Sequence, residues 1–269
     1  MTTRQIQTII LDWAGTTVDF GSRAPVAALE RVFAAYGIQL SSSEARKDMG
    51  LLKRDHIRSI LQQPRIRKAW AELNGAAPGE QEAELLFREF LPIQSGVLDE
   101  FSDVIPGVVE TVSTWRSYGL RIGATTGYTK ALMEIVTLHA GKQGYAPDVS
   151  VTPDMVGCGR PAPLMVYRNA IETGTYPLWR FVKIGDTPVD MQEGRNAGTW
   201  TIGITRTGNE VGLSESEWAA LGADAQEQRL LQADRVLREA GACYTAPSVA
   251  ECTPILEEIG ERLAAGERP

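Results

Sequence analysis

The sequence has few cysteines and no long apolar run, and each shortage excludes a class of protein. Its three cysteines, Cys158, Cys243 and Cys252, show no CxxC spacing. They therefore indicate neither a disulfide framework nor a zinc site, and they favour a reducing compartment. The apolar run Thr8–Leu11 is too short for a signal peptide or a membrane span. We expect a soluble cytoplasmic protein that does not act on a membrane.

The chain also lacks a positive net charge. Its 27 basic and 34 acidic residues leave a net charge of −7, which argues against a nucleic-acid partner. The segment from Glu44 to Lys68 is an exception, because eight basic and three acidic residues give it a local charge of +5. Such a segment can attract a small anion. The alternative is an ordinary solvated helix face.

Most of the 269 residues alternate short apolar runs with helical patterns. This alternation predicts an α/β fold with a Rossmann-like parallel sheet, and the chemistry of such sheets lies at the carboxyl ends of the strands. We expect strands at Thr8–Asp12, Arg121–Thr125, Asp148–Thr152, Phe181–Asp186, Thr199–Thr205 and Ala242–Tyr244. We expect helices at Val108–Tyr118, Lys130–His139, Leu164–Glu172, Asp190–Ala197 and Thr253–Ala264.

Residues 21–99 break this alternation. They contain helical patterns without an intervening strand, at Ala24–Tyr36, Ser43–Leu61, Arg65–Leu73 and Gly79–Gln94. We therefore expect a helical cap domain over residues 21–99, inserted into an α/β core domain formed by residues 1–20 and 100–269. The region Arg206–Gln226, with its glycine and serine content, is expected to be a surface excursion.

Four motifs follow expected strands and carry candidate functional groups. Asp12 ends the first strand, where a carboxylate can attack phosphorus, although such an aspartate is often only a turn or helix cap. Thr126-Gly127 offers a hydroxyl and backbone amides to phosphate oxygens, or forms a simple turn. Arg160 could pair with a phosphoryl group. The pair Asp186 and Asp190 suits Mg²⁺, which prefers carboxylate oxygens, or caps a helix.

In this order, the four motifs resemble those of the haloacid dehalogenase superfamily, and the resemblance covers the whole chain. It implies that Asp12 is the nucleophile and that residues 21–99 form the cap. It also implies that Mg²⁺ is bound by the Asp12 carboxylate, the Ala14 backbone carbonyl and Asp186. Asp190 would then support the metal directly or through water.

Ala14 departs from the phosphatases of this superfamily, which usually have a second aspartate at that position for acid–base work. A leaving group that needs no proton from this position would tolerate the loss. An aldehyde converted to a protonated imine by a lysine provides one, because the carbon then leaves as a neutral enamine. Lys53 is the candidate, since Met49, Lys53 and His56 are spaced to share one face of a predicted helix. The alternative is a surface lysine on an exposed helix.

The segments Asp12–Thr17, Met49–Lys53, Thr126–Tyr128, Gly159–Pro161 and Gly185–Thr187 resemble the carbon–phosphorus-cleaving branch of the superfamily. This resemblance implies hydrolysis of phosphonoacetaldehyde to acetaldehyde and phosphate, in 2-aminoethylphosphonate degradation, by a homodimer formed through the caps. The implied catalytic residues are Asp12, Lys53, His56 and Met49. The implied substrate-binding residues are Thr126, Gly127, Tyr128, Arg160 and Gly50. One departure is Ser22, where some members have a cysteine.

Three other functions fit parts of the pattern. A phosphatase or phosphoglucomutase would use the same core motifs, but Ala14 argues against it. A haloacid dehalogenase also uses an aspartate nucleophile, but it would leave Asp186 and Asp190 without a purpose. A catalytically inactive phosphate-binding protein would not need Asp12, Lys53 and Asp186 together.

Overall fold

The computed structural model describes residues 5–269, and its described residues contain a six-stranded parallel sheet in the order β3-β2-β1-β4-β5-β6. Chain order runs outward from β1 on one side and from β4 on the other. The sequence therefore reverses direction between these two central strands, the place where α/β sheets usually bind their ligands. The strands are β1 (Thr8–Leu11), β2 (Arg121–Thr125), β3 (Val149–Val151), β4 (Phe181–Gly185), β5 (Trp200–Ile204) and β6 (Tyr244–Ala246). This arrangement confirms the predicted α/β fold.

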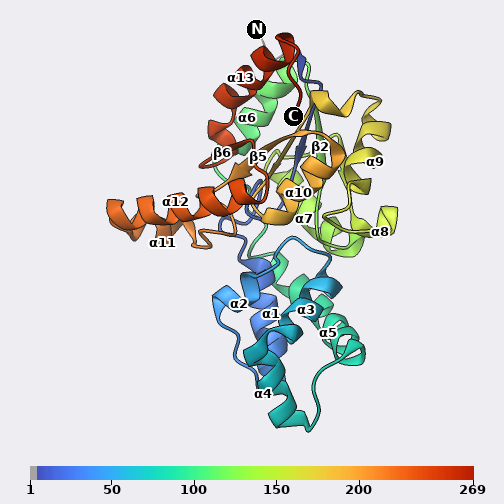
Figure 1. Ribbon diagram of the computed structural model, residues 1–269, viewed down its shortest axis with the longest axis vertical. Coiled ribbons are helices and arrows are strands. Elements are labelled where there is room, and N and C mark those ends of the chain that lie inside the picture. The colour runs from blue at the N-terminus through green and yellow to red at the C-terminus, as the bar shows by residue number, and fades with distance from the viewer. Residues whose placement is uncertain (1–4) are drawn as a thin grey trace.

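Helices cover both faces of the sheet, as parallel strands with apolar side chains on both faces require. In Figure 1, α6 and α13 lie on one side of the sheet and α9 and α10 on the other. The core helices are α6 (Val108–Ser117), α7 (Lys130–Lys142), α8 (Pro153–Val156), α9 (Leu164–Thr173), α10 (Pro188–Ala197), α11 (Glu215–Ala220), α12 (Ala223–Glu239) and α13 (Thr253–Ala264). Within residues 5–269, no helix has the length and apolar character to cross a membrane.

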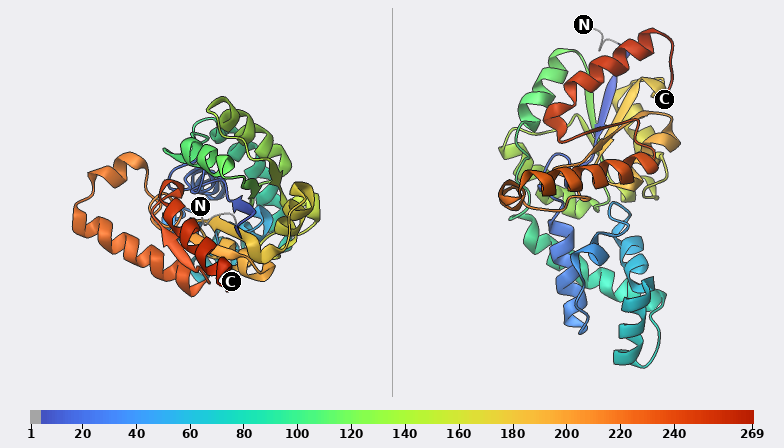
Figure 2. Two further views of the ribbon diagram at one scale, coloured as in Figure 1. Left: turned by 90° about the horizontal axis from the view of Figure 1, so that it is seen from above. Right: turned by 60° about the vertical axis from the view of Figure 1, so that its left-hand side comes forward.

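The remaining helices form a separate lobe at the carboxyl ends of the strands (Figures 1 and 2). They are α1 (Ala24–Ala35), α2 (Ser42–Arg46), α3 (Lys53–Gln62), α4 (Pro64–Asn74) and α5 (Glu80–Leu98). Two linkers pair side by side where the chain enters and leaves the lobe, through an antiparallel bridge between Val18 and Val104. The predicted boundaries at residues 20/21 and 99/100 remain a prediction, and residues 1–4 of the first segment lie outside the described residues.

The expected helix Ser43–Leu61 is wrong, because the chain turns between α2 and α3. Asp48 and Gly50 take left-handed backbone conformations, with φ of 61° and 90°, and a continuous helix cannot contain them. Met49 therefore lies in the turn, and Lys53 is the first residue of α3. The argument that Met49, Lys53 and His56 share one helix face is wrong for Met49. Tertiary contact still brings its Sδ within 3.5 Å of the Lys53 Nζ.

The expected surface excursion at Arg206–Gln226 is also only partly right. Thr207, Asn209 and Val211 are buried, so this stretch begins inside the protein. Its later part forms α11 and the start of α12, which extend away from the sheet in Figure 1. Helix α12 was missed because only Ala233 and Leu237 are buried along it, which leaves little apolar periodicity to detect.

The buried apolar side chains of the lobe are continuous with those of the sheet, and within the lobe α5 packs on α1 and α3. Phe90 of α5 is fully buried, whereas Leu85 on the same helix is 43% exposed. Replacing Phe90 with alanine should lower the free energy of unfolding by about 3–5 kcal/mol, because it leaves a cavity. The matched change Leu85→Ala should stay within about 0.5 kcal/mol of the wild type. Urea denaturation would measure both, and equal effects would contradict the assigned core.

Candidate active site

Asp12 lies one residue beyond β1, at the point where the strand order reverses. The strand forms because Ile9, Ile10 and Leu11 bury their side chains completely between two neighbouring strands. The Asp12 amide donates to the Ile184 carbonyl at 2.9 Å, which continues the pairing with β4 and fixes the backbone. Only 6% of Asp12 is exposed. The sheet thus holds this carboxylate rigidly at its carboxyl edge.

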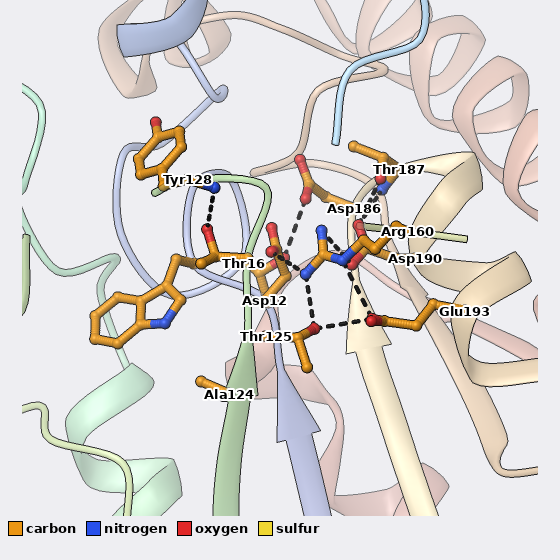
Figure 3. Close-up of polar contacts among 12 residues, drawn as sticks. Asp12, Thr16, Ala124, Thr125, Tyr128, Arg160, Asp186, Thr187, Asp190 and Glu193 are labelled. Atoms are coloured by element: carbon orange, nitrogen blue, oxygen red, sulfur yellow. Dashed lines mark hydrogen bonds and ion pairs between the residues drawn. The ribbon is translucent and has the colours of Figure 1, made fainter. Parts of the chain in front are cut away.

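Arg160 is the centre of a buried group of ion pairs at this edge, drawn in Figure 3. Its guanidinium lies 2.6 Å from Asp12 Oδ1, 2.9 Å from Asp190 Oδ1 and 3.1 Å from Glu193 Oε2. It also donates to the Thr125 hydroxyl at 2.8 Å. Burial opposes the charge on Arg160, but the carboxylates of Asp12, Asp190 and Glu193 outweigh it and raise the arginine pKa. Arg160 is therefore a permanent cation beside Asp12.

Lys183 of β4 forms a second buried cation behind Arg160. Its Nζ lies 2.8 Å from Asp190 Oδ1, 3.3 Å from Glu193 Oε2 and 2.8 Å from the Thr125 hydroxyl. The other oxygen of Asp190 accepts the Thr187 hydroxyl at 2.5 Å. Both oxygens of Asp190 are therefore occupied by protein groups.

Asp186, by contrast, forms no ion pair with any cation within residues 5–269. Its Oδ2 accepts the Asn209 amide at 2.8 Å, and its Oδ1 accepts the Thr16 hydroxyl at 3.2 Å. Burial, together with the charges of Asp12 and Asp190, raises the pKa of Asp186 well above its ordinary value. Burial is also the main cause of the raised pKa of Asp12, which Asp190 reinforces and Arg160 opposes. These shifts indicate negative charge that the protein leaves uncompensated.

Lys53 approaches this site from the lobe. The side chain is 2% exposed, with its Nζ 5.5 Å from the centre of the Tyr128 ring and 3.5 Å from Met49 Sδ. Burial lowers the pKa of Lys53 to about 8, although the charge of Asp12 opposes the change. At neutral pH about a tenth of such a lysine is the free amine, far more than for a lysine of ordinary pKa.

His56 lies one helical turn after Lys53 and is fully buried. Burial, reinforced by the charge of Lys53, lowers its pKa to about 3. The imidazole is therefore neutral at physiological pH, and it adds no second positive charge beside the amine.

The site is a small cavity between the lobe and the core. Its volume is about 20 Å³, room for a single water molecule. The backbones approach closely here, since a Cβ on Gly127 would lie 2.8 Å from the Leu51 carbonyl oxygen. Gly50 is equally restricted, because its φ is 90° and a Cβ would lie 2.6 Å from the Thr187 hydroxyl. The lobe is thus closed over the core.

Known proteins resemble this chain over nearly its whole length. A sequence model of haloacid dehalogenase-like hydrolases matches residues 6–198. Phosphonoacetaldehyde hydrolase from Syntrophobacter fumaroxidans is 42% identical, over 99% of this chain and 96% of that protein. The phosphonoacetaldehyde hydrolase of Bacillus cereus strain AH187 is 44% identical, over 95% of this chain and 97% of that protein. A crystal structure of a phosphonoacetaldehyde hydrolase-like protein from Oleispira antarctica superimposes with a TM-score of 0.97, at 38% identity, over 99% of this chain and 97% of that chain.

The chain belongs to the phosphonoacetaldehyde hydrolase family of the haloacid dehalogenase superfamily.

Membership in this family of hydrolases explains the uncompensated charge, because haloacid dehalogenase-like hydrolases generally use a divalent metal. Oxygens of Asp12, Asp186 and Asp190 all lie within 4.8 Å of one another. Four buried carboxylates (Asp12, Asp186, Asp190 and Glu193) outnumber the buried cations near them, Arg160, Lys183 and the largely protonated Lys53. This negative excess would attract a divalent cation, so the residues present fit a metal.

The structure brings most of the predicted site residues of this hydrolase to one cavity. The lining includes nine of them: Asp12, Ala14, Met49, Gly50, Lys53, Thr126, Gly127, Tyr128 and Arg160. Ser22, where the sequence departs from some family members, also lines the cavity. Asp186, Asp190 and His56 do not line it, although Asp186 and Asp190 lie beside Asp12 in the carboxylate cluster. The roles of these residues remain predictions.

Sequence reasoning missed Lys183, Glu193 and Asn209. Lys183 is a charged residue inside the apolar strand Phe181–Gly185, which is itself a signal, since fully buried lysines almost always have a partner. Glu193 follows Asp190 by three residues on α10 and so shares its face. Asn209 gave no signal, because its contact with Asp186 joins segments 23 residues apart through a backbone amide.

Removing the Asp186 carboxylate should weaken Mg²⁺ binding most. We expect wild-type protein to bind Mg²⁺ in a calorimetric titration, and Asp186→Asn to lose more than about 100-fold in affinity. Asp190→Asn should lose about 10–100-fold, the usual effect of a supporting residue. Asp154→Asn removes an exposed carboxylate and serves as the matched control. Wild-type affinity in Asp186→Asn would refute the assigned metal site.

The lowered pKa of Lys53 should be visible in the pH dependence of its chemical labelling. Because burial disfavours the charged ammonium, the free amine should accumulate as the pH rises through about 8. Competitive acetylation followed by mass spectrometry would give this midpoint, with exposed lysines of ordinary pKa, about 10.4, as internal references. A Lys53 midpoint equal to that of the exposed lysines would contradict the burial argument.

Proposed function

We propose that this hydrolase cleaves the carbon–phosphorus bond of phosphonoacetaldehyde to give acetaldehyde and phosphate, with Asp12 as nucleophile and Lys53 as imine-forming amine. The observation that carries the proposal is that these two residues line one closed cavity with Ala14. The amine has a lowered pKa, and the position two residues after the nucleophile has no acid. The family name of the relatives gives the substrate.

The proposed reaction begins at Lys53. Its free amine attacks the aldehyde carbon, and loss of water gives an imine that is protonated on nitrogen. Met49 and Tyr128 surround the Nζ with sulfur and an aromatic face, and this buried setting raises the share of free amine available to react. Neutral His56 completes this environment, a tuning role that its pKa of about 3 favours over proton shuttling.

Asp12 then attacks phosphorus, and the carbon–phosphorus bond breaks. The bonding electrons move to the iminium, so the carbon leaves as a neutral enamine and Asp12 becomes an aspartyl phosphate. Arg160, 2.6 Å from Asp12, would offer its one remaining N–H group, on Nη1, to a phosphonate oxygen. Thr126 and the Gly127 amide would hold these oxygens from the side of β2, while Gly50 and Tyr128 line the carbon end.

The enamine and the aspartyl phosphate are then both hydrolysed. The enamine takes a proton on carbon and becomes an iminium. Water then hydrolyses the iminium, which releases acetaldehyde and regenerates the Lys53 amine. A second water releases phosphate from Asp12. Ala14 fits this scheme, because neither carbon nor phosphorus needs a proton from its position when the bond between them breaks.

We propose Mg²⁺ as the metal of this site. The Asp12 carboxylate, the Ala14 carbonyl and Asp186 would hold it, and Asp190, whose oxygens are occupied by Arg160, Lys183 and Thr187, would support it indirectly. Bound Mg²⁺ would stabilise negative charge on the phosphonate oxygens. Oxygen ligands alone surround this point, which suits Mg²⁺ rather than a softer metal.

We further propose a cytoplasmic homodimer that acts in 2-aminoethylphosphonate degradation. Leu73 on the lobe is 58% exposed, and such an apolar side chain is a candidate for a contact between two lobes. Light scattering on a Leu73→Glu variant would test this arrangement.

Sodium borohydride should trap the substrate on Lys53. When it is added with phosphonoacetaldehyde, we expect a stable alkyl adduct on the Lys53 peptide and loss of activity. Lys53→Ala should give no adduct and no phosphate release, and Lys53→Arg should also be inactive, because a guanidinium does not form the imine. Release of phosphate from a simple phosphate monoester at a comparable rate would favour a phosphatase. An active Lys53→Arg variant would overturn the imine mechanism.

A further inference from the structure

Arg46 is the last residue of α2 and makes an unusual set of contacts across the border between lobe and core. Its Nη1 donates to the carbonyls of Gly21 and Ser22, at 2.8 and 3.2 Å, and to the Asn209 side-chain oxygen at 3.1 Å. Its Nη2 donates to the Gly212 carbonyl at 2.9 Å. One side chain of the lobe therefore binds both the entry linker and a loop of the core.

The core loop that Arg46 binds, Thr207–Leu213, also supports the metal carboxylate. The Asn209 amide donates to Asp186 Oδ2, while the Asn209 side chain accepts from Arg46. The Thr207 hydroxyl donates to the Gly15 carbonyl at 2.9 Å, three residues beyond the nucleophile. A single residue, Asn209, thus connects the Arg46 guanidinium to Asp186.

The loop is shaped around the guanidinium. Gly212 has a φ of 67°, and a Cβ at this position would lie 2.5 Å from Arg46 Nε. The four oxygens outside α2 that accept from Arg46 are all uncharged: three backbone carbonyls and the Asn209 side-chain oxygen. Their directions match the planar guanidinium of arginine, and no carboxylate is among them. Arg46 also lines a cleft of about 840 Å³ between the lobe and the core, beside the site.

We propose that Arg46 is a positioning residue that clasps the lobe to the core in the closed state and seats Asn209 against Asp186. The inference rests on the proposed function, in which Lys53 of the lobe must reach Asp12 of the core. Because the closed cavity holds only one water, substrate enters when the lobe opens and breaks the Arg46 contacts. Closure restores these contacts, so Asp186 is held in position at the same time as Lys53 reaches the site.

The contacts of Arg46 with Gly21 and Ser22 extend this role to the cavity wall. Ser22 has a φ of 49°, a conformation that needs support from its surroundings, and it lines the cavity. The carbonyl of the same residue accepts from Arg46. Arg46 therefore also holds a residue of the entry linker that lines the cavity.

The test compares Arg46→Met and Arg46→Lys with Arg65→Met. Arg65 is a matched control, because it is also a lobe arginine with several acceptors, but both Glu44 and Gln39, which it binds, lie within the lobe. Three measurements are made on the full-length protein with Mg²⁺. They are amide hydrogen exchange over residues 205–213, phosphate release from phosphonoacetaldehyde, and the rate of borohydride trapping on Lys53.

In Arg46→Met we expect faster amide exchange over residues 205–213 and a kcat for phosphate release lower by about 10–100-fold, the effect of losing charged hydrogen bonds. Trapping on Lys53 is measured at about pH 10.5, where much of the amine is free with or without the lobe over it. Under this condition it should stay within about threefold of the wild type, and Arg46→Lys should recover only part of the lost phosphate release. Arg65→Met should match the wild type in all three measurements.

Unchanged exchange over residues 205–213 in Arg46→Met would overturn the clasp, whatever the substrate proves to be. Trapping that falls in parallel with phosphate release would also overturn it, because it would indicate general damage to the lobe. If wild-type protein releases no phosphate from phosphonoacetaldehyde, the proposed function fails, and the exchange comparison still decides the clasp.

Discussion

The buried charge cluster around Arg160 is the constraint on which the rest of the site depends. Charged groups can be buried only when they are paired, and Arg160 and Lys183 reach Asp12, Asp190 and Glu193 only if β1, β2 and β4 are neighbours. Among the described residues no cation pairs with Asp186, and burial together with the charges of Asp12 and Asp190 raises its pKa. The sheet order therefore places Asp12 at this edge and also creates a site for added positive charge.

A second constraint comes from the contact between the two parts of the chain. Lys53 has its lowered pKa only while the lobe covers it, because burial is the main cause of the shift. Closure in turn brings the backbone of the lobe so close to the core that a side chain would not fit between them. Gly50 and Gly127 allow this approach because they have no Cβ. The share of free amine on Lys53 therefore depends on how well the lobe covers it. A residue that holds the lobe in place also affects the pKa of Lys53.

The sequence predicted those parts of the structure that local patterns determine. The existence of the strands and the parallel sheet followed from apolar runs that alternate with helices, and Asp12, Arg160 and Asp186 were found from motifs at strand ends. The break between α2 and α3 did not follow, because Asp48, a non-glycine residue, adopts a left-handed conformation that local preference does not favour. The buried loop around Asn209 was also missed, since its polar composition is typical of a surface. Its burial depends on partners from distant segments, Gly15, Gly21 and Arg46.

These constraints together explain why the site can function with alanine, rather than an acid, at position 14. In a phosphatase with an aspartate at that position, the nucleophile and the acid both belong to the core, so a closed lobe is needed chiefly to exclude water. In the proposed reaction, the lysine that makes the carbon a good leaving group lies on the lobe, and the proposed nucleophile Asp12 lies on the core. On the proposed function, bond cleavage is therefore conditional on closure itself. This condition explains why Arg46, which touches no reacting atom, binds both the entry linker and the loop whose Asn209 supports Asp186.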